Sequence, residues 1–407
     1  MRRRVVVTGL GCISPSGLDV STSWQSLAAG ESSIRPLQAG DCDVRIASGA
    51  RVCNFHPDKH FPGDQLAYLD RFSQFAIVAA REALDHADLR GNHAVLESAA
   101  AIVGTGCGGK QTDEETYRKL YKEGRSKVHP LTIPKGMPSA AASLVSASLG
   151  MRGPVFSVAS ACASGAHAII QGTQMIQSGL IDVALVGGTD APFTCGLLKS
   201  WEALRVVSED TCRPFSYDRT GLVLGEGAAM LVLEAKEHAL SRGAAIHAVI
   251  AGFGMTSDAG HITRPDVKGI SVAMNQALRM AGLSTNEVDY INAHGTGTQM
   301  NDLVETEAIN QVFGSNAGHL AVSSTKSMHG HALGASSAIE VVITVMALKT
   351  GLMPPTANFT AAGKGCNLDY VPNVARNLRI RSALSNAFAF GGLNAVIALC
   401  AGSDQNL

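Results

Sequence analysis

The chain has 407 residues, of which 46% are hydrophobic and 16% charged, with 43 glycines and a formal net charge of −1. This composition suits a compact, turn-rich protein with a large buried core and excludes a disordered or fibrous chain. A net charge so close to zero also argues against a surface that attracts nucleic acid or an anionic membrane as a whole.

The first predicted element is a buried strand, Val5-Val6-Val7-Thr8-Gly9, which runs into a glycine turn and a polar loop. Its apolar run of three valines is too short for a secretory signal. Gly9-Leu10-Gly11 does not predict a dinucleotide site, because no third glycine and no helix follow at the required spacing.

This opening recurs later in the chain, since residues 248–260 again show a buried strand, a glycine turn and a polar loop. A second echo follows in the same order: predicted helices end at 83–89 and 277–283, and a short apolar strand follows each. Two matches in the same order indicate an internal duplication. We therefore predict an N-terminal half over residues 1–250 and a C-terminal half over residues 251–407.

Strands alternate with helical patterns in both halves, which predicts an α/β fold with mostly parallel sheets covered by helices. In such folds, sites lie at the carboxyl ends of strands, where loops meet. Candidate chemistry is therefore expected directly after predicted strands, at the boundary of the two halves.

Cys162 follows the apolar strand at 153–160 and precedes a helix of small residues over about 163–178. The free N–H groups of the first helical turn and the helix dipole favour a thiolate, so we expect a pKa well below ~8.5 and a nucleophile. The same N–H groups can hold the oxygen of a tetrahedral intermediate. The alternative, a buried structural cysteine, is the expectation for the other eight cysteines.

The nine cysteines are scattered, and no two form a C-x-x-C pair. An odd, dispersed set predicts reduced thiols in a reducing compartment, with neither a disulfide framework nor a zinc cage. The longest mostly apolar stretch, at 341–348, is shorter than a membrane span. Together these patterns predict a soluble, cytoplasmic protein.

His294 comes directly after a predicted strand, in a loop where Thr296 and Thr298 offer hydrogen bonds to a long substrate arm. His331 again lies between a strand and a helix, over 332–348. Neutral imidazole N–H groups can stabilise an enolate oxygen during decarboxylation, and one imidazole can help to deprotonate a thiol.

The two histidines of His329-Gly330-His331 also suggest a metal site as an alternative. No carboxylate or cysteine lies at ligand spacing around them, so we predict no metal. Cys162 belongs to the first half and both His294 and His331 to the second, as expected for one site shared by duplicated halves.

The motifs resemble those of one family, the type II β-ketoacyl-[acyl carrier protein] synthases, over essentially the whole chain. The segments that carry the resemblance are 161–165 around Cys162, 292–298 around His294, 326–331 around His331, 390–394, 211–216 and 225–228. Within this branch, 201–206 and 385–389 are most similar to the nodulation protein E-type synthases.

The resemblance implies a thiolase-like fold, with two duplicated βαβαβαββ halves packed as a five-layer α-β-α-β-α sandwich. It implies an acyl-enzyme on Cys162, decarboxylation assisted by His294 and His331, and an oxyanion hole from the N–H groups of Cys162 and Phe390. By the same resemblance, the remaining residues support these groups or bind the substrate: Lys326 and Glu340 position the histidines, Thr296 and Thr298 bind phosphopantetheine, and Ala389, Phe390 and Gly391 form the gate of the acyl tunnel.

The resemblance further implies no cofactor beyond the phosphopantetheine of an acyl carrier protein, and either a homodimer or a heterodimer with a chain-length partner. Three departures from the family pattern stand out. Ala389 replaces a flexible glycine and Leu393 a threonine at the gate, and Cys107 replaces a bulkier isoleucine in the tunnel. Segment 62–68 lacks the basic cluster that relatives use to bind the acidic carrier.

Carrier docking is therefore expected at other cations, namely Arg205, Lys122, Arg125 and Lys127, and a solvated surface loop is the alternative interpretation of the last three. A plain thiolase would need a second catalytic cysteine near residue 390, and a type III starter synthase an asparagine in place of His331; neither is present. Hydrolysis of acyl thioesters by Cys162 and a histidine remains the alternative reaction, and the ketosynthase subunit of a heterodimer the alternative assembly. The pathway, fatty acid or specialised polyketide, polyene or signal lipid, stays open.

Overall fold

The computed structural model describes residues 3–37 and 42–402. Its ten main strands form one continuous sheet in the order β10-β9-β13-β14-β8-β1-β7-β6-β4-β5. The first-half strands are β1 (Val5–Ile13), β4 (Ala100–Gly104), β5 (Val155–Val158), β6 (Val183–Asp190) and β7 (Gly227–Ala235). The second-half strands are β8 (Ala248–Ser257), β9 (Tyr290–Asn292), β10 (Ala321–Ser323), β13 (Ser382–Ala389) and β14 (Leu393–Ala401).

The strand order repeats itself across the middle of the sheet. Reading outward from the centre gives β1-β7-β6-β4-β5 on one side and β8-β14-β13-β9-β10 on the other, so each strand has a counterpart at the same position. The two sides meet where β1 and β8 run antiparallel, with Val6 opposite Val249. This arrangement is the internal duplication that the sequence echo indicates.

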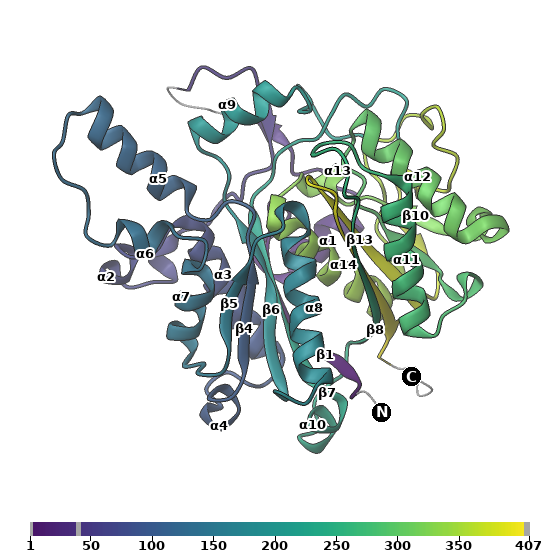
Figure 1. Ribbon diagram of the computed structural model, residues 1–407, viewed down its shortest axis with the longest axis horizontal. Helices are drawn as coiled ribbons and strands as arrows, with labels where there is room; N and C mark the ends of the chain where they lie inside the picture. Colours follow the sequence, from purple (N-terminus) through teal and green to yellow (C-terminus); the bar gives the residue numbers. More distant parts are fainter. Residues whose placement is uncertain (1–2, 38–41, 403–407) are drawn as a thin grey trace.

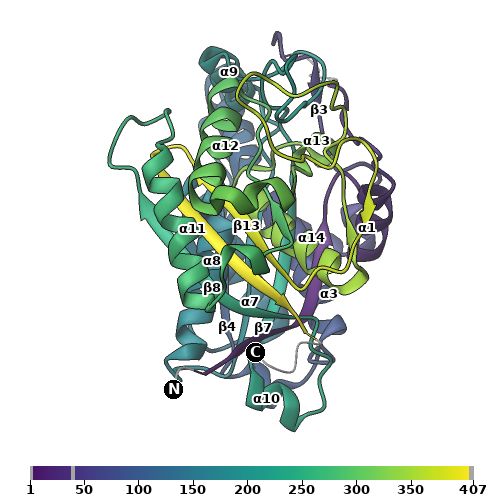
Figure 2. The same ribbon diagram turned by 90° about the vertical axis from the view of Figure 1, so that its right-hand side faces the viewer.

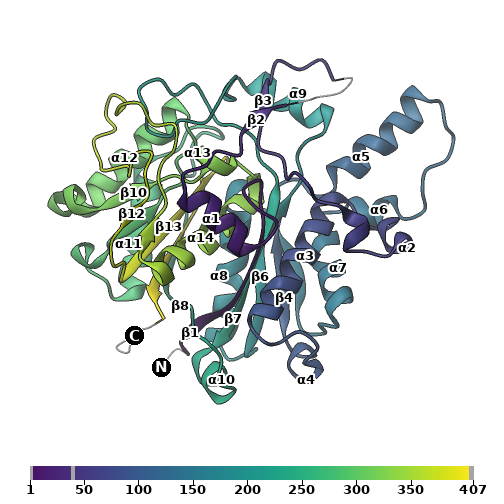
Figure 3. The same ribbon diagram turned by 180° about the vertical axis from the view of Figure 1, so that it is seen from behind.

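Helices lie on both faces of each half and between the halves (Figure 1). The first half's outer face is covered by α3 (Arg71–His86) and α7 (Ala140–Leu149), and in Figure 3 α3 lies in front of that half's strands. The second half's outer face is covered by α11 (Val267–Ala281) and α12 (Gln299–Phe313), which face the viewer in Figure 2.

The middle layer consists of α8 (Ser164–Gln177) and α14 (Ser336–Thr350), which pack on each other and on strands of both halves. The layers therefore alternate as helix, sheet, helix, sheet, helix, which is the predicted five-layer sandwich. Shorter elements complete the chain: α1 (Val20–Ala28), β2 (Arg35–Pro36), β3 (Ser48–Gly49), η1 (Pro57–Lys59), α2 (Gly63–Leu66), α4 (His93–Leu96), α5 (Lys110–Tyr117), η2 (Arg118–Lys122), α6 (Thr132–Gly136), η3 (Ala161–Ala163), α9 (Cys195–Leu204), α10 (Lys236–Ser241), η4 (Thr285–Glu287), η5 (Gly314–His319), α13 (Lys326–His329), η6 (Leu333–Ala335), β11 (Leu352–Met353) and β12 (Arg376–Asn377).

The glycine turns of the sequence echo have a packing reason. A Cβ at Gly11 would lie 1.9 Å from the carbonyl oxygen of Ala79 in α3, and a Cβ at Gly254 would lie 1.9 Å from that of Ala273 in α11. The helix backbone thus rests directly on the central strand in both halves, and only glycine leaves room for it.

The expectation of mostly parallel sheets is wrong. Within the ten-stranded sheet, four pairings are parallel and five are antiparallel, because β7 and β14 are inserted antiparallel beside β6 and β13. The parallel pairings remain at β4, β5 and β6 and at β9, β10 and β13, whose carboxyl ends carry the candidate chemistry. Alternation of strand and helix patterns could not reveal the added antiparallel strands.

The apolar stretch of α14 is also longer than expected. Residues Leu333–Thr350 are long and apolar enough to cross a membrane by length and composition, but 83% of this segment is buried inside the fold. This segment contains α14, one of the two middle-layer helices, so its apolar surface is covered by strands of both halves. The expected stretch of 341–348 was too short because Glu340 interrupts the apolar run without ending the helix, which begins at Ser336.

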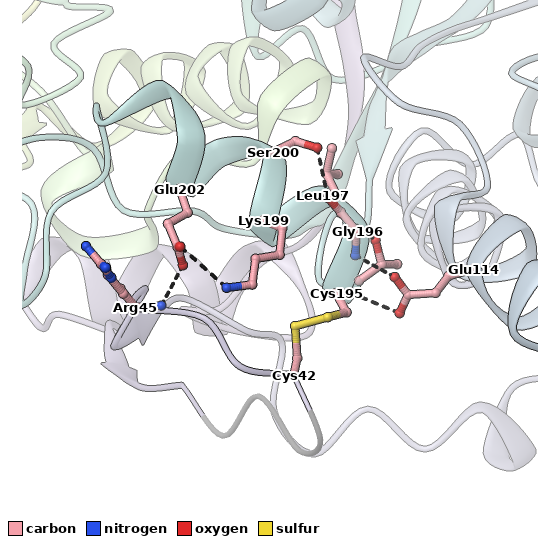
Figure 4. Close-up of a disulfide and its surroundings, with 10 residues drawn as sticks. Cys42, Arg45, Glu114, Cys195, Gly196, Leu197, Lys199, Ser200 and Glu202 are labelled. Carbon is pink, nitrogen blue, oxygen red and sulfur yellow. Dashed lines mark hydrogen bonds and ion pairs between the residues drawn. A yellow bond between two sulfur atoms is a disulfide. The ribbon is translucent and has the colours of Figure 1, made fainter. Parts of the chain in front are cut away.

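The prediction of nine reduced thiols is wrong for two of them. Cys42 and Cys195 form a disulfide between a loop and the first residue of α9, shown in Figure 4. The two residues are 153 positions apart and belong to no spacing motif, so the sequence could not pair them. Cys12, Cys53, Cys107, Cys162, Cys212 and Cys366 are free thiols.

The packing of α8 on α14 gives a direct test of the middle layer. A Cβ at Gly165 would lie 2.9 Å from the backbone of Ala338 and from the carbonyl oxygen of Gly334. We expect Gly165→Ala to lower the free energy of unfolding by about 1–3 kcal/mol, because the two helices must separate. Thermal or urea unfolding would measure it, with Gly63→Ala as the matched control, since no atom lies within 4 Å of its Cβ. Equal stability of the two variants would contradict this account.

Candidate active site

Cys162 lies at a backbone turn that the fold holds in an unusual conformation. Ala161, just before it, has φ of 49°, a left-handed value that costs a non-glycine residue about 1–3 kcal/mol. Leu333, which occupies the equivalent turn before α14, also has φ of 49°. Each turn leads through a short 3-10 segment into a middle-layer helix, and the first one presents the cysteine.

The structure brings Cys162 and both predicted histidines together. Sγ of Cys162 lies 3.1 Å from Nε2 of His331, and the ring centroids of His294 and His331 are 5.5 Å apart, with the rings nearly perpendicular. All three side chains are buried and line one cavity of about 250 Å³. Nδ1 of His331 lies 2.9 Å from Oγ of Ser336, which orients the imidazole.

Lys326 and Glu340 lie next to His294 and do not line the cavity. The Lys326 ammonium donates to the Glu340 carboxylate and, at 2.6 Å, to the carbonyl oxygen of His294, and it lies 3.4 Å from Nδ1 of His294. Both side chains are fully buried. Burial raises the pKa of Glu340, and the neighbouring Lys326 charge opposes that rise.

Both catalytic-site imidazoles are neutral near pH 7. Burial, followed by the positive charge of Lys326, holds the pKa of His294 and of His331 well below the usual 6.5. An imidazole in this state can accept a proton on one nitrogen and donate from the other. The prediction of neutral imidazoles agrees with this.

The expected low pKa of Cys162 is wrong. Burial raises the pKa of the thiol to about 12; Lys326 and the N–H groups of Phe390 and of Cys162 act to lower it, and Asp190 acts to raise it. The helix N-terminus is present, but the interface between the halves excludes the water that a thiolate needs. At rest, Cys162 is therefore a neutral thiol beside a neutral imidazole.

The remaining predicted residues occupy different depths of the site. Thr296 and Thr298 line the cavity, with their hydroxyl oxygens 2.9 Å apart; Ala389, the last residue of β13, and Phe390, which follows it, also line the cavity. Gly391 lies next to that lining, with φ of 85°, and its N–H donates to the carbonyl oxygen of Ile262. Cys107 is outside the cavity, packed in an apolar cluster with Phe390 and Leu333.

The four cations expected to dock a carrier do not lie together. Arg205 is exposed at the C-terminus of α9 and lines the cavity that contains Cys162. Lys122, Arg125 and Lys127 belong to an arm that begins with α5 and projects from the body of the molecule in Figure 1. Lys122 lines a second cavity beside this arm.

Three buried carboxylates that the sequence reading missed hold the site loops. Glu305 accepts the N–H groups of His294 and Gly295 at 2.9 and 2.8 Å. Asp302, one turn earlier in α12, accepts the N–H groups of Phe215 at 2.7 Å and Gly297 at 3.2 Å. Two acids three residues apart on the buried face of α12 were the available signal.

The third carboxylate, Asp190, ties three segments together beneath Cys162. It accepts the N–H groups of Gly106, Cys107 and Gly334 at 2.8, 3.0 and 2.7 Å, and the Thr105 hydroxyl at 2.8 Å. Burial raises its pKa to about 6, with these donors opposing. Its position at the carboxyl end of β6, after Gly187-Gly188-Thr189, was a signal of the same kind as those used for Cys162 and His294.

No group of three or more histidine, cysteine, aspartate or glutamate side chains within residues 3–37 and 42–402 is arranged to hold a metal ion.

Trp201 is a further residue of the site that the sequence did not single out. It lines the cavity and stacks on Phe390 with ring centroids 6.0 Å apart.

Comparison with known proteins identifies the family to which the chain belongs. Residues 2–239 match the family model of the β-ketoacyl synthase N-terminal domain, and residues 247–360 match that of its C-terminal domain. The chain belongs to the β-ketoacyl synthase family. The predicted family, thiolase-like fold and enzyme class are thereby confirmed.

Relatives match this β-ketoacyl synthase along its whole length. "Nodulation protein E" of Rhizobium sp. (strain N33) is 49% identical over 98% of this chain and 99% of that protein. "3-oxoacyl-[acyl-carrier-protein] synthase 2" of Coxiella burnetii is 41% identical over 98% of each. A solved structure named "The ishigamide ketosynthase/chain length factor" superposes with a TM-score of 0.93 at 35% identity, over 98% of this chain and 100% of that one.

The raised pKa of Cys162 can be tested by labelling. We expect the rate of Cys162 alkylation by iodoacetamide to rise about tenfold per pH unit between about pH 6 and pH 9, without a plateau, because only the thiolate reacts and the thiol stays mostly protonated. Peptide mass spectrometry over time measures it, and Cys162→Ala gives the background from exposed Cys53. A plateau below about pH 8 would mean that a thiolate–imidazolium pair forms at rest.

Proposed function

We propose that the protein condenses an acyl group carried on Cys162 with a malonyl group carried by an acyl carrier protein, releasing carbon dioxide and a 3-oxoacyl thioester. The observation that carries this proposal is the 3.1 Å contact between Sγ of Cys162 and Nε2 of His331, in a cavity shared with His294. The names of the relatives, among them a 3-oxoacyl-[acyl-carrier-protein] synthase, support it.

In the first half-reaction, His331 is the base. With its Nδ1 proton directed to Ser336, its Nε2 lone pair accepts the thiol proton as Sγ of Cys162 attacks the acyl thioester. The developing oxyanion accepts hydrogen bonds from the backbone N–H groups of Cys162 and Phe390, the same groups that act to lower the pKa of the thiol. The carrier's thiol leaves with the proton, and Cys162 holds the acyl group.

In the second half-reaction, His294 and His331 assist decarboxylation, and His294 stabilises the enolate. Lys326 faces Nδ1 of His294, so the histidine carries its proton on Nε2, where it can donate to the oxygen of the malonyl thioester. Carbon dioxide leaves, and the resulting carbanion attacks the acyl carbon on Cys162. The carbon–sulfur bond breaks, the product departs on the carrier, and the Cys162 thiolate takes up one proton from solvent to restore the thiol.

The substrates reach Cys162 on phosphopantetheine, and we propose no other cofactor. Thr296 and Thr298 offer hydroxyl groups along the cavity to the amides of such an arm. Phe390, gated through Ala389 and Gly391, separates this cavity from the cluster with Cys107 that would receive the acyl chain. Arg205, at the same cavity, is the cation that we expect to meet the acidic carrier.

We further propose a dimer built on the edge strand β5, either a homodimer or a heterodimer with a chain-length partner. β5 ends the ten-stranded sheet, and its Phe156 is 38% exposed, which suits pairing with a second edge strand. One structural neighbour is named as a ketosynthase with a chain length factor. We also propose that the two halves divide near residue 250, where β8 begins the second half, and that the protein is cytoplasmic.

For the pathway, we propose a specialised lipid in preference to housekeeping fatty acids. The relatives named Nodulation protein E are 48–49% identical to this chain, against 40–41% for those named 3-oxoacyl-[acyl-carrier-protein] synthase 2. Cys107, Ala389 and Leu393 differ from the common family residues near the acyl chain and can admit another chain shape, since pocket contacts discriminate by ~1–3 kcal/mol.

Mass spectrometry separates the two half-reactions. We expect the wild-type protein mixed with acyl carriers to gain the mass of one acyl group, and Cys162→Ala to gain none while still releasing carbon dioxide from malonyl carrier. The matched control, His294→Ala, should be acylated but decarboxylate at least ~100-fold more slowly. Release of free fatty acid by the wild type without condensation would instead support the hydrolase alternative.

Carrier docking can be tested by charge reversal. We expect Arg205→Glu to raise KM for carrier-bound substrate about tenfold, because an acidic partner is repelled at the cavity mouth, with little change for a small-molecule thioester. The control is Lys122→Glu, on the projecting arm. A larger effect of the Lys122 variant would place the carrier on the arm.

A further inference from the structure

The Cys42–Cys195 disulfide lies outside the catalytic cavity, where solvent can reach it. Both cysteines are half-buried and line a second cavity of about 870 Å³. Exposed residues form part of its wall, including Tyr121, which is 81% exposed. A dissolved thiol can therefore approach the two sulfurs, whereas Cys12, Cys212 and Cys366 are buried.

The disulfide fastens the loop that contains Cys42 along α9. Cys195 is the first residue of α9, and near the other end of the helix the N–H of Arg45 donates to the Glu202 carboxylate at 2.6 Å (Figure 4). The loop is thus attached to the helix at two points, one covalent and one a hydrogen bond. Figure 4 shows both attachments on the same side of α9.

This helix forms one wall of the substrate site. Trp201 lies six residues after Cys195, a distance of ~9 Å along the helix axis, and stacks on Phe390 with centroids 6.0 Å apart. Val44 and Ile46 of the loop pack in the same apolar cluster as Trp201, Phe390 and Cys107. The loop, the helix and the gate residue therefore share one packed cluster next to Cys162.

We propose that Cys42 and Cys195 are a redox-active pair whose reductant is a dithiol, and that their redox state sets how wide a range of acyl groups the site accepts. The acyl readout rests on the proposed function; the redox chemistry does not. With the disulfide formed, the loop and α9 hold Trp201 against Phe390 and the acyl space stays narrow. With it reduced, the loop is held by the Arg45–Glu202 hydrogen bond and by packing, and the wall can yield to longer or branched chains.

The chemistry is thiol–disulfide exchange. One thiolate of the dithiol attacks a sulfur of the pair and forms a mixed disulfide, while the other protein sulfur leaves and takes up a proton. The second thiol of the reductant then attacks the mixed disulfide and releases the second cysteine, which is also protonated. The protein gains two electrons and two protons, and the dithiol becomes a cyclic disulfide. Oxidation by a small disulfide such as glutathione disulfide reverses the change.

The experiment compares wild type, Cys195→Ser and the control Cys53→Ser, whose cysteine is exposed and forms no disulfide. Each protein is equilibrated with dithiothreitol or with glutathione disulfide, and differential alkylation with peptide mass spectrometry reports the state of Cys42 and Cys195. Each is then given an equimolar mixture of hexanoyl and hexadecenoyl carriers, and intact mass gives the ratio of long to short acyl-enzyme. Hydrogen exchange of residues 42–47 and of α9 supplies a readout that needs no catalysis.

We expect reduction to raise the long-to-short ratio about tenfold in wild type and in Cys53→Ser, within the range by which pocket contacts discriminate. Cys195→Ser should show the high ratio and fast exchange under both conditions. Equal ratios and equal exchange of oxidised and reduced wild type would overturn the proposal, as would an equal redox response in Cys195→Ser, which would point to oxidation of Cys162. If no acyl-enzyme forms in any state while exchange still responds to reduction, the proposed function fails and the redox pair stands.

Discussion

The site depends on how closely the two middle-layer helices approach each other. Cys162 comes from the turn before α8 and His331 from the segment before α14, and their reacting atoms lie 3.1 Å apart. That approach needs Gly165, where a Cβ would lie 2.9 Å from the backbone of Ala338 and of Gly334, and it needs Gly334, where a Cβ would lie 2.5 Å from the backbone of Gly106. It also needs Ala161 and Leu333 in left-handed conformations, which the surrounding packing maintains at a cost of about 1–3 kcal/mol each. The strained backbone lies where the nucleophile is presented.

Burial at this crossing determines the protonation states of Cys162, His294 and His331. A site closed to bulk water leaves Cys162 and both imidazoles neutral, and the charged pair Lys326–Glu340 is kept one layer behind them. Neutral groups suit a reaction that moves protons between thiol, imidazole and enolate, since each step ends without an isolated buried charge. The same exclusion of water protects an acyl-enzyme and a carbanion, both of which water would destroy.

Buried carboxylates that take no part in the reaction fix the backbone of the loops around the site. Glu305 fixes the backbone of His294, Asp302 fixes Gly297, and Asp190 joins the turn at Gly106 to the turn at Gly334. Each satisfies N–H groups that irregular backbone would otherwise leave unpaired inside the protein. The catalytic loops are therefore rigid although they contain many glycines, and the variable part of the site is the apolar wall around Trp201 and Phe390.

The sequence by itself predicted the candidate site residues and the duplication, because strand-end positions and repeated glycine turns are local patterns, and its family resemblance implied the five-layer architecture. It did not determine the antiparallel strands, the raised pKa of Cys162, the buried length of α14 or the disulfide at Cys42 and Cys195. Each of these depends on segments far apart in the chain: which strand is inserted beside β6, how much water the second half excludes from the first, which surfaces cover a helix, and which loop lies beside α9. A local sequence pattern indicates the chemistry of a side chain. Its burial and its contacts are determined only when the two halves pack together.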